Sequence, residues 1–163
     1  MISAWRIVKA RYAAAAFDGE GALRSGGRWN SPGRRVIYSS ATASLAILEI
    51  LAHLGSAKAL TAWILIECRF EARLVISLDQ SMLPPLWQRY PAPAEVQAIG
   101  DRWIDGGSSA VFGVPSVLVP QETNYLLNPE HPDFASIEIL PAVPFPLDTR
   151  LTEKQKAESR KQK

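Results

Sequence analysis

An almost uninterrupted apolar stretch over residues 43–54 constrains the fold more than any other feature of the chain. Nine of its twelve residues are Ala, Ile or Leu, and only Ser44, Glu49 and His53 are polar. This pattern predicts a helix that ends at Gly55, because glycine is favoured just past the last turn of a helix. A helix that is apolar on nearly every side has to be largely buried, so the rest of the chain must fold around it.

Glu49 is the unusual residue of this predicted helix, since it lies among Leu45, Leu48 and Ile50. A carboxylate in apolar surroundings costs free energy unless it is hydrogen-bonded or paired. Two structural explanations are an ion pair with His53 one turn further on and a solvated helix face. The functional explanation is an active site, where such groups are enriched. Composition alone leaves both kinds of explanation open.

The remaining segments predict more strands than helices. A long polar loop is expected at 17–32, a second helix at 95–105 stopped by Gly106-Gly107, and a turn-rich segment at 124–134. Strands are expected at 5–11, 35–39, 60–70, 74–78, 110–119 and 137–140, with three prolines closing the ordered part after residue 140. This pattern favours a compact α+β domain with a mixed or antiparallel sheet and a few helices.

Length and cysteine content exclude several classes of protein. The 163 residues suffice for one domain with its own core. Cys68 is the single cysteine, so no disulfide forms within the chain, and with only two distant histidines it matches no zinc-ligand pattern. The start of the chain is unlike a secretory signal, and no apolar run reaches the roughly 18 residues that span a bilayer. We therefore expect a cytoplasmic protein with no metal and no membrane partner.

The formal net charge is +2, but the charged residues are distributed unevenly along the chain. Residues 1–35 carry seven Lys or Arg against two acids, residues 36–149 five against twelve, and residues 150–163 six against two. We therefore predict a folded domain over 1–149 and a flexible basic tail over 150–163. A nucleic-acid-binding module remains an alternative, although no stripe of aromatic residues accompanies the basic ones. The positive charge near Arg28 points instead to a small anionic ligand.

Two segments outside the apolar helix carry polar groups that could bind a ligand. Arg28 follows Gly26-Gly27, a combination that suits close approach to phosphate or carboxylate oxygens, although such clusters more often form surface turns. Ser116 follows a proline that interrupts an apolar strand, and without the spacing of a catalytic triad it fits a hydrogen-bonding role better than a nucleophilic one. Asn124 by itself is typical of a turn former.

In combination these segments resemble the RES-domain family, which is named for its Arg, Glu and Ser. The resemblance extends over about residues 5–140 and rests on segments in the family's order and spacing. They are Gly26-Gly27-Arg28-Trp29-Asn30, Val36-Ile37-Tyr38-Ser39-Ser40, Leu45-Ala46-Ile47-Leu48-Glu49, Val114-Pro115-Ser116-Val117 and Asn124-Tyr125-Leu126-Leu127-Asn128-Pro129. The resemblance implies a fold similar to ADP-ribosyltransferase toxins and an enzyme that acts on NAD+ as its substrate, with no cofactor.

Site residues follow from the same resemblance. It assigns catalytic positions to Arg28, Tyr38 and Glu49, and substrate-binding positions to Ser116, Arg6 and Asn124. On chemical grounds a guanidinium suits the phosphates. The Tyr38 ring can lie against nicotinamide, and the Glu49 carboxylate can stabilise the positive charge that develops on the ribose.

The implied biological role is that of the toxin in a bacterial toxin–antitoxin pair, cleaving NAD+ as a glycohydrolase or phosphorylase. A protein ADP-ribosyltransferase is the alternative. Ile47 stands two residues before Glu49, where transferases to arginine commonly have a glutamate, and this favours water or phosphate as acceptor. The resemblance further implies a homodimer bound by a helix-turn-helix antitoxin that covers the active site, so that any DNA contact would be the antitoxin's. A binding protein with an inactive pocket is a third interpretation, disfavoured by the intact Arg28, Tyr38 and Glu49.

Overall fold

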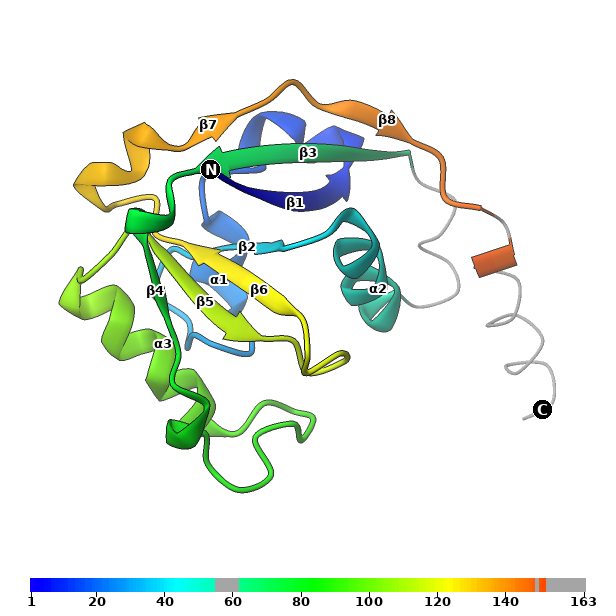
Figure 1. The fold of residues 1–163 in the computed structure, drawn as a ribbon. Coiled ribbons are helices and arrows are strands. Elements are labelled where there is room, and N and C mark those ends of the chain that lie inside the picture. Colours follow the sequence, from blue (N-terminus) through cyan, green and yellow to red (C-terminus); the bar gives the residue numbers. More distant parts are fainter. Residues whose placement is uncertain (55–61, 149, 152–163) are drawn as a thin grey trace, which may run out of the picture.

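The computed structural model describes residues 1–54, 62–148 and 150–151, and over these residues the chain forms one mixed sheet flanked by helices (Figure 1). The sheet has eight strands in the order β4-β5-β6-β2-β1-β3-β7, with β8 also paired to β3. They are β1 (Ile2–Lys9), β2 (Ile37–Ser40), β3 (Trp63–Phe70), β4 (Val75–Ser77), β5 (Val111–Pro115), β6 (Thr123–Leu127), β7 (Glu138–Ile139) and β8 (Val143–Phe145). The helices are α1 (Glu20–Ser25), α2 (Ala43–His53) and α3 (Ala94–Gly106), with short 3₁₀ turns between elements. The predicted α+β class is confirmed.

The sheet is divided into two parts where β1 meets β2. Within each part the strands pair over several residues, but β1 and β2 share one registered pair, Trp5 with Ser40. Figure 1 shows β1 and β3 running across the molecule while β5 and β6 run away from them at a steep angle. α2 packs on the β1 side through Ala46 against Ile7 and Trp63, and α3 packs on the β5–β6 side. The divergence leaves room for a cleft between the two parts.

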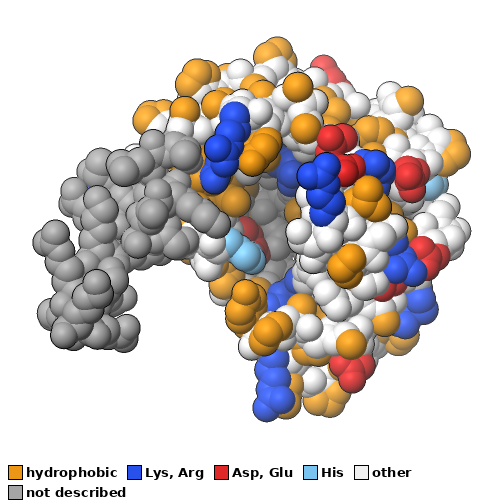
Figure 2. All heavy atoms as spheres, turned by 180° about the vertical axis from the view of Figure 1, so that it is seen from behind, with side chains coloured by type: hydrophobic (Ala, Val, Ile, Leu, Met, Phe, Trp, Pro, Cys, Tyr) orange, Lys and Arg blue, Asp and Glu red, His pale blue; other side chains and the backbone are white. Residues whose placement is uncertain are grey.

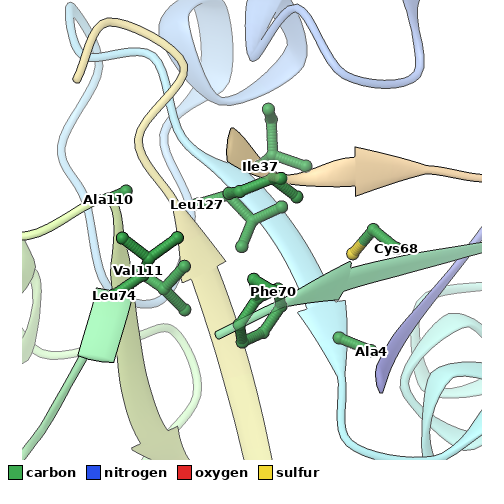
Figure 3. Packing of buried hydrophobic residues seen from close by; sticks show 9 residues of the cluster. Ala4, Ile37, Cys68, Phe70, Leu74, Ala110, Val111 and Leu127 are labelled. Atoms are coloured by element: carbon green, nitrogen blue, oxygen red, sulfur yellow. The ribbon is translucent and has the colours of Figure 1, made fainter. Parts of the chain in front are cut away.

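The central core joins the two parts of the sheet (Figure 3). Ala4, Ile37, Phe70 and Leu127 come from four different strands, and all are fully buried. Cys68 lies in the same cluster, where burial raises the pKa of its thiol to about 12. The thiol therefore serves as a small apolar core group.

α2 occupies the predicted segment but is much less buried than its composition indicates. Thr42 caps its start by accepting a hydrogen bond from the Leu45 amide at 3.0 Å. Only Leu45 and Ala46 are buried, and Leu48 is 41% exposed. The prediction of a largely buried helix is wrong, because α2 covers β1 with one face and borders the cleft with another. Gly55, the predicted stop, lies outside the described residues.

Several segments differ from the sequence-based prediction. The polar loop at 17–32 contains α1, and the turn-rich segment at 124–134 contains β6, which lies inside the sheet between β5 and β2. Pairing on both sides overrides the turn preference of Asn124. The prolines after residue 140 predict irregular structure, but β8 contains Pro144 and pairs with β3, because an edge strand tolerates proline. The predicted strand at 110–119 ends early, at Pro115.

The other predicted elements are confirmed with shifted ends. The strands at 5–11, 35–39, 74–78 and 137–140 correspond to β1, β2, β4 and β7, and the helix at 95–105 to α3, whose end is capped by Gly107 in the left-handed conformation. The strand at 60–70 is β3 from Trp63 onward, and its predicted first residues lie partly outside the described ones. The boundary between the domain at 1–149 and the tail at 150–163 stays a prediction. Across the described residues, no helix has the length and apolar character needed to cross a membrane.

Gly100 fixes the distance between α3 and the loop that carries Arg28. A Cβ at this position would collide with the backbone carbonyl of Trp29, whereas Gly106 on the same helix has open space around it. We expect Gly100→Ala to lower the free energy of unfolding by about 2 kcal/mol or more. Gly106→Ala should leave it unchanged or raise it by up to about 1 kcal/mol. Urea unfolding of both variants measures the difference, and equal stability of the two would contradict this packing.

Candidate active site

The cleft between the two parts of the sheet has a volume of about 1020 Å³, large enough for a ligand of dinucleotide size. Its walls come from β1, β2, α2, the loop around residues 25–29 and the segment around residues 88–92. Figure 2 shows the hollow from the outside, with acidic and histidine side chains at its wall and basic side chains at its margin. Arg6, Arg28, Tyr38, Glu49 and Asn124 all line this one cleft.

Glu49 is held by two side chains from other elements. Its Oε1 atom accepts hydrogen bonds from Ser116 Oγ at 2.8 Å and from Asn124 Nδ2 at 2.6 Å. Over the part of the chain that the structure describes, the other oxygen, Oε2, accepts no hydrogen bond. One oxygen is thus fixed by donors, which leaves the second to interact with a ligand. The alternative ion pair with His53 is not formed, because His53 Nδ1 contacts the Glu49 backbone carbonyl at 2.7 Å.

Ser116 is fully buried and lies behind Glu49, outside the lining of the cleft. Its hydroxyl accepts hydrogen bonds from the Leu118 and Val119 amides, each at 3.1 Å, while donating to Glu49. This geometry gives Ser116 a positioning role, and the predicted direct contact with substrate stays a prediction.

Ser116→Ala tests this positioning role. The substitution leaves two backbone amides without their acceptor and removes one donor to Glu49. We expect it to lower the free energy of unfolding by about 1–3 kcal/mol and to reduce catalytic activity about tenfold. Thermal unfolding measures the change in stability, and initial rates of NAD+ cleavage, the reaction expected from the sequence, measure the change in activity. A variant with full stability and full activity would contradict the role.

Arg28 extends across the cleft from the glycine loop, the loop around residues 25–29 that contains Gly26 and Gly27. Its Nη1 atom donates to the backbone carbonyls of Trp87 and Arg89, both at 3.0 Å. Partial burial lowers the pKa of Arg28 from its ordinary value, and the charge of Glu49 opposes that shift. A guanidinium carries five N–H donors, so donors remain for an anionic ligand. The loop itself turns at Gly26, which has a φ of 67°.

Tyr38 connects the glycine loop to β2. Its hydroxyl donates to Asn30 Oδ1 at 2.7 Å and accepts from the Trp29 amide at 3.1 Å. Burial raises the pKa of Tyr38 well above its ordinary value, so the phenol stays neutral. A Cβ on Gly27 would collide with the Tyr38 ring, which explains why a glycine stands there.

Arg6 lies deep in the cleft, and two of its guanidinium nitrogens already donate to backbone carbonyls. Its Nε atom donates to the Ala16 carbonyl at 2.7 Å, and its Nη1 atom donates to the Tyr38 carbonyl at 2.6 Å. Burial lowers the pKa of Arg6 to about 10. The second contact ties β1 to β2 and the first ties β1 to the segment that follows it, and a direct substrate contact for Arg6 stays a prediction.

Sequence reasoning missed three polar residues around the site. Asn30 is fully buried and orients Tyr38, while Gln97 on α3 donates to the Gly27 carbonyl at 3.0 Å. Ser40 donates to Asn124 Oδ1 at 2.7 Å. Asn30 belongs to the glycine segment that the sequence singles out, but Gln97 and Ser40 act on residues about 70 and 84 positions away. Over the described residues, no group of three or more His, Cys, Asp or Glu is placed to hold a metal.

Over the described residues, the structure is that of an α+β protein whose divided sheet holds an anchored carboxylate, Glu49, in a cleft. The RES domain family model matches residues 3–148, and the chain belongs to this family. A Toxin Res of Yersinia enterocolitica is 38% identical over 90% of this chain and 97% of the relative. The Prs ADP-ribosylating toxin of Sphingobium sp. strain YBL2 is 35% identical over 93% of this chain and 98% of the relative. The predicted family resemblance is thereby confirmed.

A solved structure supports the fold. The crystal structure of the M. tuberculosis MbcT-MbcA toxin–antitoxin complex contains a chain that matches with a TM-score of 0.70 at 20% identity. The match covers 96% of this chain and 89% of that chain. At this level of identity, the likeness extends to the fold alone.

Proposed function

We propose that the protein is the toxin of a toxin–antitoxin pair and that it cleaves NAD+ at the bond between nicotinamide and ribose. The observation that carries the proposal is Glu49, a carboxylate with one oxygen anchored by two donors inside a cleft of dinucleotide size. Membership of the RES domain family and relatives named as toxins support the biological role.

Glu49 performs the electrostatic part of the reaction. When the bond between nicotinamide N1 and ribose C1 breaks, its electron pair goes to the nicotinamide nitrogen, and the ribose develops the positive charge of an oxocarbenium ion. The Glu49 carboxylate stabilises this charge and accepts a hydrogen bond from a ribose hydroxyl. Its donors are preorganised, so little rearrangement accompanies the reaction.

Arg28 and Tyr38 bind and orient the substrate. Arg28 uses its remaining N–H donors on the anionic diphosphate, where bidentate geometry adds direction to charge. Tyr38, neutral and locked by Asn30 and Trp29, offers its ring to the nicotinamide. Nicotinamide leaves as a neutral molecule from a cation, so the reaction needs no general acid.

Water or phosphate completes the reaction. Attack by water gives ADP-ribose and a proton, and attack by phosphate gives the 1-phosphate of ADP-ribose. The product identifies the acceptor. Purified protein is incubated with NAD+, with and without phosphate, and the products are separated by chromatography. We expect nicotinamide together with one of the two ribosyl products, and unchanged NAD+ under both conditions would refute the proposal.

A protein ADP-ribosyltransferase is the second candidate, favoured by the relative named Prs ADP-ribosylating toxin. The cleft and its carboxylate would act in the same way, with a protein side chain as acceptor. NAD+ labelled on its adenosine, incubated with cell extract, distinguishes the two. Label on a discrete protein band supports the transferase, and label confined to small molecules supports NAD+ degradation.

The proposed partner is a helix-turn-helix antitoxin that covers the cleft, in a complex built on a toxin homodimer. The structural neighbour that contains MbcT and MbcA is itself a toxin–antitoxin complex, which supports an antitoxin as partner. Leu118, which lines the cleft and is 40% exposed, offers apolar surface to such a partner. We place the protein in the cytoplasm, where NAD+ is available.

A further inference from the structure

Asn124 contacts Glu49 on one side and Ser40 on the other. Its amide Nδ2 donates to Glu49 Oε1 at 2.6 Å, and its amide Oδ1 accepts from Ser40 Oγ at 2.7 Å. Ser40 and Asn124 are registered partners on β2 and β6, and both line the cleft. Ser40 is only 4% exposed. A continuous chain of hydrogen bonds thus leads from Ser40 through Asn124 to the carboxylate.

The chemistry of an amide gives this series of hydrogen bonds a donor-to-acceptor direction. Asn124 has one oxygen that accepts and one nitrogen that donates, so a half-turn of the side chain would point its oxygen at the Glu49 carboxylate. The Glu49 carboxylate only accepts, so it selects the orientation with the nitrogen toward Glu49, and the Ser40 hydroxyl holds the amide in that orientation by donating to its oxygen. Hydrogen bonds in such a chain also strengthen one another.

We propose that Ser40 is a positioning residue that fixes the Asn124 amide and, through it, the Glu49 carboxylate. The inference rests on the proposed NAD+ cleavage, because Glu49 is the group that it serves. Ser40 itself need not touch the substrate. Its loss therefore weakens catalysis through Asn124 and leaves substrate binding by Arg28 intact.

The chain supplies a matched control in Ser39. Ser39 is the preceding residue of β2, is also 4% exposed, and donates its hydroxyl to the Tyr125 carbonyl at 2.9 Å. Ser39 also borders the cleft, but its hydroxyl is used on a backbone carbonyl of β6 and contacts neither Asn124 nor Glu49. Any effect that Ser40→Ala shares with Ser39→Ala is structural.

Initial rates of NAD+ cleavage test the proposal. We expect Ser40→Ala to lower kcat about tenfold with little change in KM, and Ser40→Thr to restore it to within about threefold. Asn124→Ala should lower kcat about 100-fold, and adding Ser40→Ala to it should cost nothing further. Full additivity, or equal losses in the Ser39 and Ser40 variants, would overturn the positioning role.

The NMR signals of the Asn124 side-chain amide provide a readout that does not depend on activity. They are assigned by their absence in Asn124→Asp. We expect Ser40→Ala to shift them and Ser39→Ala to leave them in place. Unshifted signals in Ser40→Ala overturn the role of Ser40 whatever the rates show. Shifted signals in a protein that leaves NAD+ intact would uphold the hydrogen-bond chain and refute the proposed reaction instead.

Discussion

Glu49→Gln is expected to reduce the rate of nicotinamide release at least about 1000-fold. The substitution keeps the size of the side chain and an oxygen that can accept from Ser116 and Asn124, the two donors that hold Glu49. It removes the negative charge that faces the developing oxocarbenium ion. The loss therefore measures charge stabilisation rather than packing, and kcat should fall while KM changes little.

Glu122→Gln is the matched control for this variant. Glu122 lies beside the start of α2, where its Oε2 atom accepts from the Thr42 hydroxyl at 3.3 Å, and it does not line the cleft. Neutralising it changes the net charge by the same amount, so kcat should stay within about twofold of wild type. Thermal unfolding shows whether each variant is folded. A folded Glu49→Gln protein with wild-type turnover would remove the carboxylate from the mechanism.

Arg28→Lys is expected to lower kcat/KM for NAD+ about 100-fold, mostly through KM. In the wild type, one nitrogen of Arg28 is anchored on the carbonyls of Trp87 and Arg89, which leaves the rest of the planar group to face the ligand. A lysine ammonium is a single point charge and cannot hold both the carbonyls and a diphosphate in this geometry.

Arg24→Lys controls for the loss of a guanidinium as such. Arg24 lies on α1 with a side chain that is 76% exposed, and it pairs with Glu20. Its replacement should leave kcat/KM unchanged. Steady-state kinetics over a range of NAD+ concentrations measure both variants. If Arg28→Lys also binds and cleaves NAD+ like the wild type, bidentate recognition of the diphosphate is wrong.

How much of the site the sequence could predict depends on the range of the interactions. Glu49 stood out because a charged residue in an apolar helix needs a local explanation, and Arg28 because two glycines precede it. Ser116 was noted only as a serine after a strand-interrupting proline, and the family resemblance added Tyr38 and Arg6. Ser40 stands in one of the segments that carry the resemblance, but the sequence assigns it no role, because that role depends on the register between β2 and β6, which places it opposite Asn124.

The fold, too, was predictable where local sequence determines it and not where long-range pairing does. α3 and most strands follow from local periodicity, but β6 lies in a segment rich in turn formers and becomes a strand through pairing with β5 and β2. The exposure of Leu48 on α2 was equally hidden, since composition alone indicated burial. The helix borders a cleft, and the spacing of its apolar residues does not indicate that one of its faces lines this cleft.

One measurement tests the central claim most directly, namely a proton NMR time course of NAD+ mixed with the purified protein. Free nicotinamide and NAD+ give separate signals, so the broken bond is observed without a coupled assay. We predict that the signals of the nicotinamide–ribose linkage disappear as those of free nicotinamide grow in equal amount, and that Glu49→Gln stops the change. Intact NAD+ with folded wild-type protein, in the presence of water, phosphate and cell extract alike, would contradict the claim.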